Sequence, residues 1–547
     1  MNKTINEKNI SQIRCDFPIF DNNPSLVYFD NAASSQIPKT VVEKMNDYYY
    51  NYRANVGRTS GKIASKSDNA VEKIRTQIAR FLGTQSSQII WTSGSTESLN
   101  LAALSLYKYF KKIEIKLEID KKDKSLELEK IGKIQKNFEA KSEVIITQIE
   151  HHSNFLVWPE YFKPIFWEIR KNTFWWQDLR ALVNKNTKIL AITQVSNFTS
   201  QILPIKEIIK KIRTISPNIC VVLDGSQAVF NLEIDLEDLG CDFYCFSGHK
   251  ILAPNGIGVL WVKEKWLKIL EPPKFGGGMV DQVGFLGFFE NESENQFKKL
   301  QANVGQIRQN KQQIQNSIQN STNTFENDKQ KSILKIQNET SKRNQRQIQS
   351  TWQPYPHSWE AGTPNIAGII GLGSAIKYFE NLAKNYDLAK YKMELWQYLK
   401  TKIEQIPDIC VINPVIIDSV FWQESAKTIE NKASEISEKN SNNFSKTLPS
   451  KISKILPNKL SNPISKPILN SQVPILTFYH ATINSLDLSS LLSSFNICLR
   501  SGSLCCQPFL ANLYTDSVVR VSLNFYNTKT EIDFFVIKLV QVIEILN

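Results

Sequence analysis

The residues best suited to chemistry occur in five short polar clusters, and each cluster closely follows a short apolar run. In an open sheet of alternating strands and helices, ligands bind just outside the carboxyl ends of the strands. All five clusters would then lie at one edge of one sheet, so they predict a single site. The clusters are Ser93-Gly-Ser-Thr-Glu97, Glu150-His-His152, Ser196-Asn197, Asp224-Gly-Ser-Gln227 and Ser247-Gly-His-Lys250.

Lys250 and Asp224 have the most specific chemistry in these clusters. A lysine is most often a solvated surface residue, but Lys250 follows an apolar run, where a desolvated amine can form a Schiff base. An aspartate at a strand end is most often a turn former, but Asp224 could also pair with a protonated pyridine nitrogen. The two residues together favour pyridoxal 5'-phosphate as a cofactor.

Ser95 and Thr96 fit the phosphate of such a cofactor, because they stand at the expected start of a helix. Free N–H groups and the helix dipole favour an anion there, although an ordinary helix cap would use the same residues. His151 could stack on a flat ring, or it could be a structural histidine. Three of the five histidines of the chain lie in these clusters, which favours a functional interpretation.

Six short apolar runs are the predicted strands that position the clusters. Helical patterns such as Ile205–Ile212 separate several of them, which is typical of a mainly parallel α/β sheet. The glycines between Gly368 and Gly373 indicate close helix packing rather than a dinucleotide-binding loop, because no strand precedes them. The runs are Gln88–Trp91, Val144–Ile149, Ile189–Val195, Cys220–Leu223, Phe243–Phe246 and Ile257–Val262.

The composition sets wider limits on the protein class. A chain of 547 residues predicts two or more folded units. It has neither an apolar run long enough to span a membrane nor the apolar block of a secretory signal, so we expect a cytoplasmic protein with no membrane association. The eight cysteines form no C-x-x-C pair, so we expect neither a disulfide framework nor a metal site.

The net charge of +13 comes from three segments that differ in composition from the rest of the chain. Residues 111–143, a Lys/Glu-rich run with helical periodicity, contribute +2, residues 297–350 contribute +7 and residues 424–470 contribute +4. Within the second segment the Gln/Asn-rich stretch 301–349 predicts disorder, and the third is rich in Ser, Lys and Asn. Since the remainder is neutral, we interpret the segments as insertions and expect no nucleic-acid partner.

The five clusters and four further motifs together resemble class V aminotransferase-fold enzymes, and among them the Suf-type (group II) cysteine desulfurases. The resemblance covers nearly everything except the three insertions. The further motifs are Val27-Tyr-Phe-Asp-Asn-Ala-Ala33, Glu360-Ala-Gly-Thr-Pro-Asn365, Arg500-Ser-Gly-Ser-Leu-Cys505 and Arg520-Val-Ser-Leu-Asn524.

This resemblance implies an aspartate-aminotransferase-like α/β fold (fold type I). A large domain with a mainly parallel sheet would bind pyridoxal 5'-phosphate and span residues 27–385. A smaller α+β domain would span residues 386–547, and residues 1–26 would pack with it.

The resemblance also implies a role for each site residue. Lys250 would be the Schiff-base lysine and the base that moves the Cα proton, while Asp224 would hold the pyridinium. Gln227 would bind the phenolic oxygen and His151 would cover the ring face. The residues implied at the phosphate are Ser95, Thr96, Ser247 and His249, with Thr363 reaching the phosphate of a partner subunit. Those implied around the substrate are Asn197, Arg500 and Arg520, with Arg520 taking the carboxylate.

Cys505 decides the reaction that the resemblance implies. Its thiolate would attack the sulfur of L-cysteine, leaving L-alanine and a persulfide on Cys505. Only one of Cys505 and Cys506 can face the cofactor, because neighbouring side chains of an extended loop point apart, and the resemblance selects Cys505. The family usually has histidine directly before this cysteine, where this chain has Leu504.

The resemblance further implies a homodimer that passes its sulfur to an acceptor protein of the SufE or SufU kind for iron–sulfur cluster assembly. A selenocysteine lyase or another pyridoxal-phosphate C–S lyase would have the same fold and cofactor site. A non-catalytic scaffold or nucleic-acid binder is the alternative from another class. The basic insertions lack the interleaved aromatic residues and RNA-binding motifs that it would need.

Overall fold

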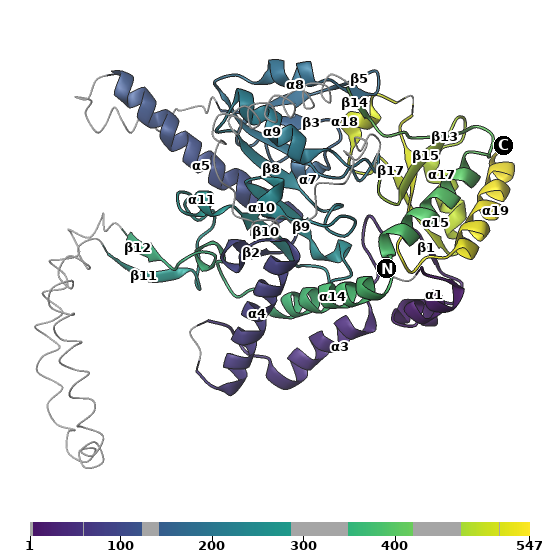
Figure 1. Ribbon diagram of the computed structural model, residues 1–547, viewed down its shortest axis with the longest axis horizontal. Helices are drawn as coiled ribbons and strands as arrows, with labels where there is room; N and C mark the ends of the chain where they lie inside the picture. Colours follow the sequence, from purple (N-terminus) through teal and green to yellow (C-terminus); the bar gives the residue numbers. More distant parts are fainter. Residues whose placement is uncertain (1–3, 58–59, 123–141, 286–347, 419–471, 514) are drawn as a thin grey trace, which may run out of the picture. The chain divides into compact units, whose positions relative to one another are not determined.

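The predicted strands form most of one seven-stranded sheet in the computed structural model of the protein (Figure 1). The structure describes residues 4–57, 60–122, 142–285, 348–418, 472–513 and 515–547. The strand order is β2-β10-β9-β8-β7-β3-β4. Its strands are β2 (Ile89–Thr92), β3 (Glu143–Thr147), β4 (Lys163–Trp167), β7 (Thr187–Thr193), β8 (Cys220–Asp224), β9 (Phe243–Ser247) and β10 (Gly258–Val262).

The directions of these strands place the polar clusters together. Strands β4, β3, β7, β8 and β9 are parallel to one another, and β10 runs antiparallel to its neighbours β9 and β2. All six predicted strands are present, and the mainly parallel sheet is confirmed. Strand β4 was not predicted. It carries Pro164 and lies at the edge of the sheet, where a missing N–H donor is tolerated.

Helices pack against this sheet through apolar faces. Helix α9 buries Ile205, Ile208, Ile209 and Ile212, one side of a regular helical repeat. Helix α14 confirms the interpretation of its glycines as packing residues, because a Cβ on Gly371 would come within 2.7 Å of Pro254. The helices are α1 (Glu7–Arg14), α2 (Pro18–Asn22), α3 (Lys39–Asp47), α4 (Lys62–Phe81), α5 (Ser95–Lys122), α7 (His152–Phe155), α8 (Trp176–Leu182), α9 (Ile205–Ile215), α10 (Leu236–Leu239), α11 (Glu264–Leu267), α14 (Ile366–Asn385), α15 (Leu388–Ile403), α17 (Ser485–Ser493), α18 (Gln507–Leu510) and α19 (Lys529–Leu546).

A second, four-stranded sheet has a separate apolar core built with α15, α17 and α19. Its order is β13-β15-β18-β17, from β13 (Ile409–Val411), β15 (Ile475–His480), β17 (Arg500–Gly502) and β18 (Val518–Ser522). Val27 and Phe29 of the N-terminal part are buried in the same core. Strand β1 (Val27–Tyr28) pairs in parallel with β16 (Ile497–Cys498), so the two ends of the chain are joined at this point. The domain limits predicted at residues 26 and 385 stay predictions.

A third sheet is small, and its order is β14-β6-β5. Its strands are β5 (Ile169–Arg170), β6 (Thr173–Phe174) and β14 (Ile416–Ile417). Everything described so far belongs to one compact unit, residues 1–274 and 363–547, and residues 275–362 form a second unit.

The second unit contains an antiparallel strand pair, β11 (Val280–Phe285) with β12 (Ile348–Trp352). The disorder predicted as far as Gln349 is therefore wrong at its end, because Ile348 and Gln349 belong to β12 and pair with β11. Residues 286–347 of that prediction lie outside the described residues.

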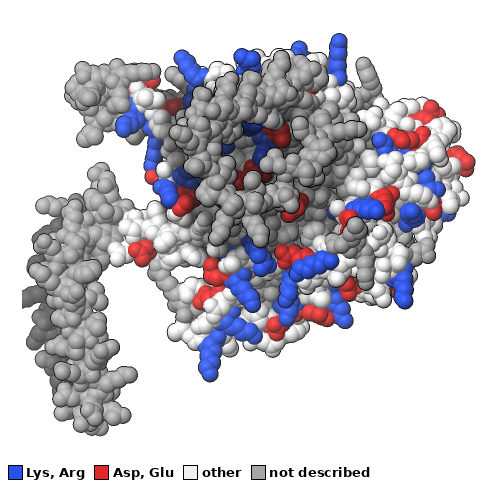
Figure 2. All heavy atoms as spheres, viewed as in Figure 1, with Lys and Arg blue, Asp and Glu red and all other residues white. Residues whose placement is uncertain are grey.

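The other two insertions are partly or wholly outside the described chain. Residues 111–122 continue α5, which confirms the helical interpretation of the first insertion as far as Lys122. Residues 123–141 and the insertion at 424–470 are not described. On the face seen in Figure 2, blue and red side chains are interspersed over the described surface of the first unit. No helix in the described part of the chain is both long and apolar enough to cross a membrane.

Candidate active site

Eleven of the thirteen predicted site residues line one cavity of about 220 Å³. They come from both sheets, because the carboxyl ends of the parallel strands face the loop that follows β17. The exceptions are Asp224, which is buried at the end of β8, and Thr363, which is exposed. The lining residues are Ala32, Ala33, Ser95, Thr96, His151, Ser153, Asn197, Gln227, Ser247, His249, Lys250, Arg500, Leu504, Cys505 and Arg520.

Hydroxyl groups surround the start of α5 at one end of the cavity. The Ser95 N–H donates to Ser247 Oγ at 2.8 Å, and the two serine hydroxyls are 2.9 Å apart. The Thr96 hydroxyl contacts Ser153 Oγ at 2.7 Å. Ser153 received no role from the sequence, although it directly follows the Glu150-His-His152 cluster. The first turn of a long helix with hydroxyl donors suits an anion.

Backbone packing fixes this end of the cavity. Gly94, directly before α5, contacts the first residue of β10, and a Cβ on Gly258 would come within 2.5 Å of the Gly94 Cα. The loop can therefore approach the strand this closely only because Gly258 lacks a side chain.

Lys250 lies at the end of the short 3-10 turn after β9, and its surroundings change the pKa of its amine. Burial lowers the pKa of Lys250, and the nearby Asp224 carboxylate opposes that shift. Asp224 is held in place by the Ser226 N–H, which donates to its Oδ1 at 2.9 Å. Burial lowers the pKa of His151 to about 4, and the charge of Lys250 adds to the effect. The imidazole of His151 is therefore neutral near pH 7.

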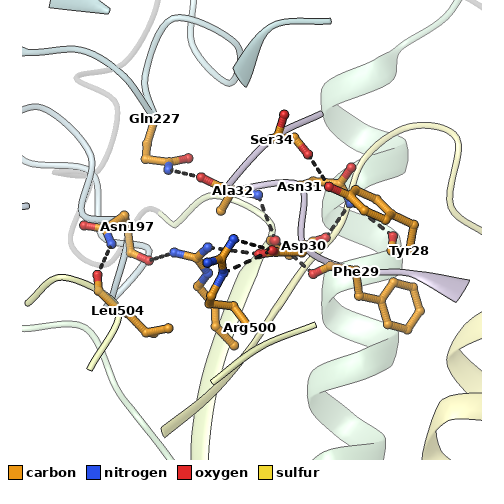
Figure 3. A network of polar contacts seen from close by, with 12 residues as sticks. Tyr28, Phe29, Asp30, Asn31, Ala32, Ser34, Asn197, Gln227, Arg500 and Leu504 are labelled. Carbon is orange, nitrogen blue, oxygen red and sulfur yellow. Dashed lines mark hydrogen bonds and ion pairs between the residues drawn. The ribbon is translucent and has the colours of Figure 1, made fainter. Parts of the chain in front are cut away.

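Gln227 and Asn197 are each fixed by a hydrogen bond to a backbone carbonyl (Figure 3). Gln227 Nε2 donates to Ala32 O at 2.7 Å, and Asn197 Nδ2 donates to Leu504 O at 2.9 Å. The second bond holds the loop that carries Cys505 against the end of β7.

Two arginines meet at the mouth of the cavity. Arg520 is buried and its Nη1 donates to Asn197 O at 3.1 Å, whereas half of the Arg500 side chain is exposed. Both guanidinium groups also bind Asp30, which received no role from the sequence (Figure 3). The only indication in the sequence that Asp30 has a function was its position inside the quoted Val27–Ala33 motif.

The two neighbouring cysteines have different surroundings. Cys505 is half-buried and lines the cavity, and its carbonyl accepts from the His152 N–H at 3.1 Å. Cys506 is fully buried, and burial raises the pKa of its thiol. Its Sγ lies 3.6 Å from Gln148 O, among core residues rather than along the cavity.

Solved structures of cysteine desulfurases have the same fold. The desulfurase CsdA of Escherichia coli has a TM-score of 0.66 at 22% identity, with 100% of both chains covered. The enzyme of Thermococcus onnurineus has a TM-score of 0.65 at 22% identity, covering 100% of this chain and 99% of that one. The fold is that of aspartate-aminotransferase-like (fold type I) enzymes, as predicted.

The family follows from the sequence match. The model of the family described as Aminotransferase class-V matches residues 27–119, 125–315, 325–418 and 413–535, so the chain belongs to that family. A probable cysteine desulfurase of Borreliella burgdorferi is 28% identical over 99% of this chain and 98% of its own. A cysteine desulfurase of Yersinia pseudotuberculosis is 26% identical over 98% and 99%.

Enzymes of this family use pyridoxal 5'-phosphate, and the residues present fit it. The hydroxyl groups at the start of α5, closed in by Gly94 and Gly258, suit the phosphate. The half-buried amine of Lys250 and the buried carboxylate of Asp224 suit the aldehyde and the ring nitrogen.

Proposed function

We propose that the protein is a pyridoxal-phosphate-dependent cysteine desulfurase that converts L-cysteine to L-alanine and keeps the sulfur as a persulfide on Cys505. The observation that carries this proposal is that Cys505 lines the same cavity as Lys250 and Arg520. A nucleophilic thiol, an amine and a carboxylate-binding guanidinium are thus placed around one small volume. The names of the relatives support the same activity.

The cofactor would be held by residues at or after the ends of four strands, β2, β3, β8 and β9. Ser95, Thr96, Ser247 and His249 would bind its phosphate, Asp224 and Gln227 its ring heteroatoms, and His151 one face of the ring. When bound, the cofactor withdraws electrons from the substrate carbon skeleton. Because His151 is neutral near pH 7, it adds no positive charge beside the ring.

Arg520 and Lys250 would act on the substrate itself. Arg520 keeps an Nε without a hydrogen-bond partner among the described residues, and a planar guanidinium suits a carboxylate. With the carboxylate held there, and Asn197 beside it, the Lys250 amine would move the proton of Cα. The lowered pKa of Lys250 favours the uncharged amine that can accept a proton.

Cys505 would complete the reaction. Its thiolate forms a bond to the sulfur of L-cysteine, the Cβ–S bond breaks, and the electron pair of that bond stays on Cβ, which then takes up a proton. The products are L-alanine and Cys505 with one additional sulfur. Arg500 and Arg520 both lie within electrostatic reach of Cys505.

The deciding experiment compares the two adjacent cysteines. Cys505→Ser should retain cofactor binding and reduce L-alanine release by at least a hundredfold, because the sulfur acceptor is gone. Cys506→Ser, the matched control, should retain most of the activity, since that thiol is in the core. Alanine release and mass-spectrometric mapping of the persulfide are the measurements. A persulfide found on Cys506 would contradict the proposal.

The later steps are proposed on chemical grounds. The outer sulfur of the persulfide must leave Cys505 before a second turnover can begin. We therefore propose that it is transferred to an acceptor protein of the SufE or SufU kind, and that the protein serves iron–sulfur cluster assembly. The half-exposed Arg500 beside the cavity leaves that end of the site open to solvent. A cytoplasmic location agrees with the eight free thiols.

A further inference from the structure

A second, much smaller cavity adjoins the active site. It has a volume of about 20 Å³, against about 220 Å³ for the cavity described above. Ala32, Gln227 and Lys250 line both cavities, so these three residues form the wall between them. Gln227 Nε2 donates to Ala32 O at 2.7 Å, which ties two parts of the wall together (Figure 3). The small cavity therefore lies directly against Lys250.

The small cavity lies inside the protein, between the segment that follows β8 and the strands β15 and β18. Asn231 and Lys250 are the half-buried residues of its lining, and the other lining residues are buried. Lys250 also lines the larger cavity, so its exposure is explained there. Solvent can thus exchange with the small cavity beside Asn231, without passing through the larger one.

Ser226 brings an unpaired polar group to this lining. Its side chain is 3% exposed, and its Oγ has no hydrogen-bond partner among the described residues. The backbone is fixed, because the Ser226 N–H donates to Asp224 Oδ1 at 2.9 Å. A buried hydroxyl without a partner costs free energy, and folded proteins satisfy most such groups with protein atoms or ordered water.

The size and the chemistry of the small cavity suit one water molecule. Its volume of about 20 Å³ exceeds the roughly 10–15 Å³ that a single water needs, and it is too small for an organic ligand. No carboxylate occurs among the described residues that line it, and Lys250 is basic, so the lining disfavours a metal cation.

We propose that the small cavity binds one water molecule, which exchanges protons with the Lys250 amine while the substrate fills the larger cavity. This inference rests on the proposed function, in which Lys250 moves the proton of Cα. Water suits both protonation states of Lys250, because it can donate to the uncharged amine and accept from the ammonium. After Lys250 takes up the Cα proton, its ammonium gives one proton to the water and takes another from it, so no net charge moves.

The test follows the Cα proton by isotope. The holoenzyme receives L-cysteine with deuterium at Cα in ordinary water, and mass spectrometry measures the fraction of deuterium kept in L-alanine. The wild type should keep little, because the buried water exchanges with the deuterated amine. In Ser226→Val the side chain occupies the space of the water, so the retained fraction should rise about threefold or more. Ser226→Ala removes only the hydroxyl and should also raise it, which covers a Val variant that does not fold.

A matched control separates this role from the loss of any buried hydroxyl. Ser105 of α5 is also a buried serine whose Oγ has no partner among the described residues, and it lines neither cavity. Ser105→Ala should therefore keep the wild-type fraction of deuterium. An equal rise in Ser105→Ala and Ser226→Ala would overturn the inference.

A crystal structure gives a measurement that does not depend on turnover. The wild type should show one ordered water within hydrogen-bond distance of Ser226 Oγ, and Ser226→Val should show none. No ordered water there in the wild type would overturn the inference.

The inference and the proposed function can fail separately. A wild-type holoenzyme that releases no L-alanine from L-cysteine would overturn the proposed function and the exchange role together. Normal alanine release, with the same deuterium retention in the wild type and both Ser226 variants, would overturn the exchange role alone.

Discussion

The two histidines that line the cavity are shifted by burial toward their uncharged forms. Burial and then the charge of Lys250 lower the pKa of both His151 and His249 to about 4. Above pH 5, neither imidazole therefore adds to the positive charge of Arg500 and Arg520. Near the arginines the charge is set by Arg500, Arg520 and the Asp30 carboxylate that binds both.

Glu150, directly before His151, gives a prediction about stability. It is fully buried, accepts from Thr147 Oγ1 and Asn154 Nδ2, and burial raises its pKa to about 8. The unfolded chain ionises Glu150 near pH 4.3, so folding favours the protonated form. The stability linked to this proton is complete below that pH and is lost as the pH rises to about 8.

Glu150→Gln cannot ionise and should remove that dependence. We compare the free energy of unfolding of the wild type with that of the variant at each pH. The wild-type value minus the variant value should fall by roughly a few kcal/mol as the pH rises from 5 to 8. Denaturant unfolding at several pH values measures the difference, and Glu160→Gln, at an exposed position nearby, is the control. A difference that stays constant with pH would show that Glu150 does not bind the proton.

At the scale of elements, the antiparallel strand β10 holds the anion-binding end of the cavity in place. It lies between β9 and β2, and its first residue pairs with both Ser247 and Thr92. The start of α5 is therefore positioned from a strand that comes much later in the sequence. Gly258 permits this contact, because the Gly94 backbone occupies the place of a side chain.

Gly258→Ala should weaken cofactor binding. A Cβ at 2.5 Å from the Gly94 Cα must push the loop before α5 away from β10, which moves Ser95 and Thr96. We expect the dissociation constant of pyridoxal 5'-phosphate to rise at least tenfold, measured by equilibrium dialysis. Gly277→Ala has open space around its Cβ and should bind the cofactor as the wild type does. If the two variants bind pyridoxal 5'-phosphate with equal affinity, this account of the anion-binding end of the cavity is contradicted.

The sequence predicted the elements better than the contacts between them. Short apolar runs in the sequence predicted six strands of the large sheet. The edge strand β4 was missed because Lys163 and Pro164 interrupt its apolar pattern. Eleven of the predicted site residues line one cavity, since strand ends of a parallel sheet share an edge, and their roles stay predictions. Asp30 could not be assigned from the residues, because its partners lie 470 and 490 positions away.

At the scale of the whole molecule, Thr363 bears on the oligomeric state. Its side chain is exposed and does not line the cavity of its own chain. A role for Thr363 at a phosphate therefore requires the cavity of a second copy, and the homodimer stays a proposal on that ground.

The dimer is tested by mass and by cofactor affinity. Light scattering should give about twice the chain mass of 62.7 kDa. Thr363→Ala should retain that mass and bind pyridoxal 5'-phosphate several times more weakly, while Thr401→Ala, at an exposed threonine on α15, should match the wild type. A monomer with full activity would rule out a shared site.

The pairing of β1 with β16, and of Asp30 with Arg520, has a consequence for how the protein is made. Asp30 leaves the ribosome 490 residues before Arg520, which at ordinary translation rates is on the order of half a minute or more. Throughout that time Val27 and Phe29 lack the C-terminal residues that bury them. The cavity can close only after the last part of the chain has emerged, because Arg500, Cys505 and Arg520 line it.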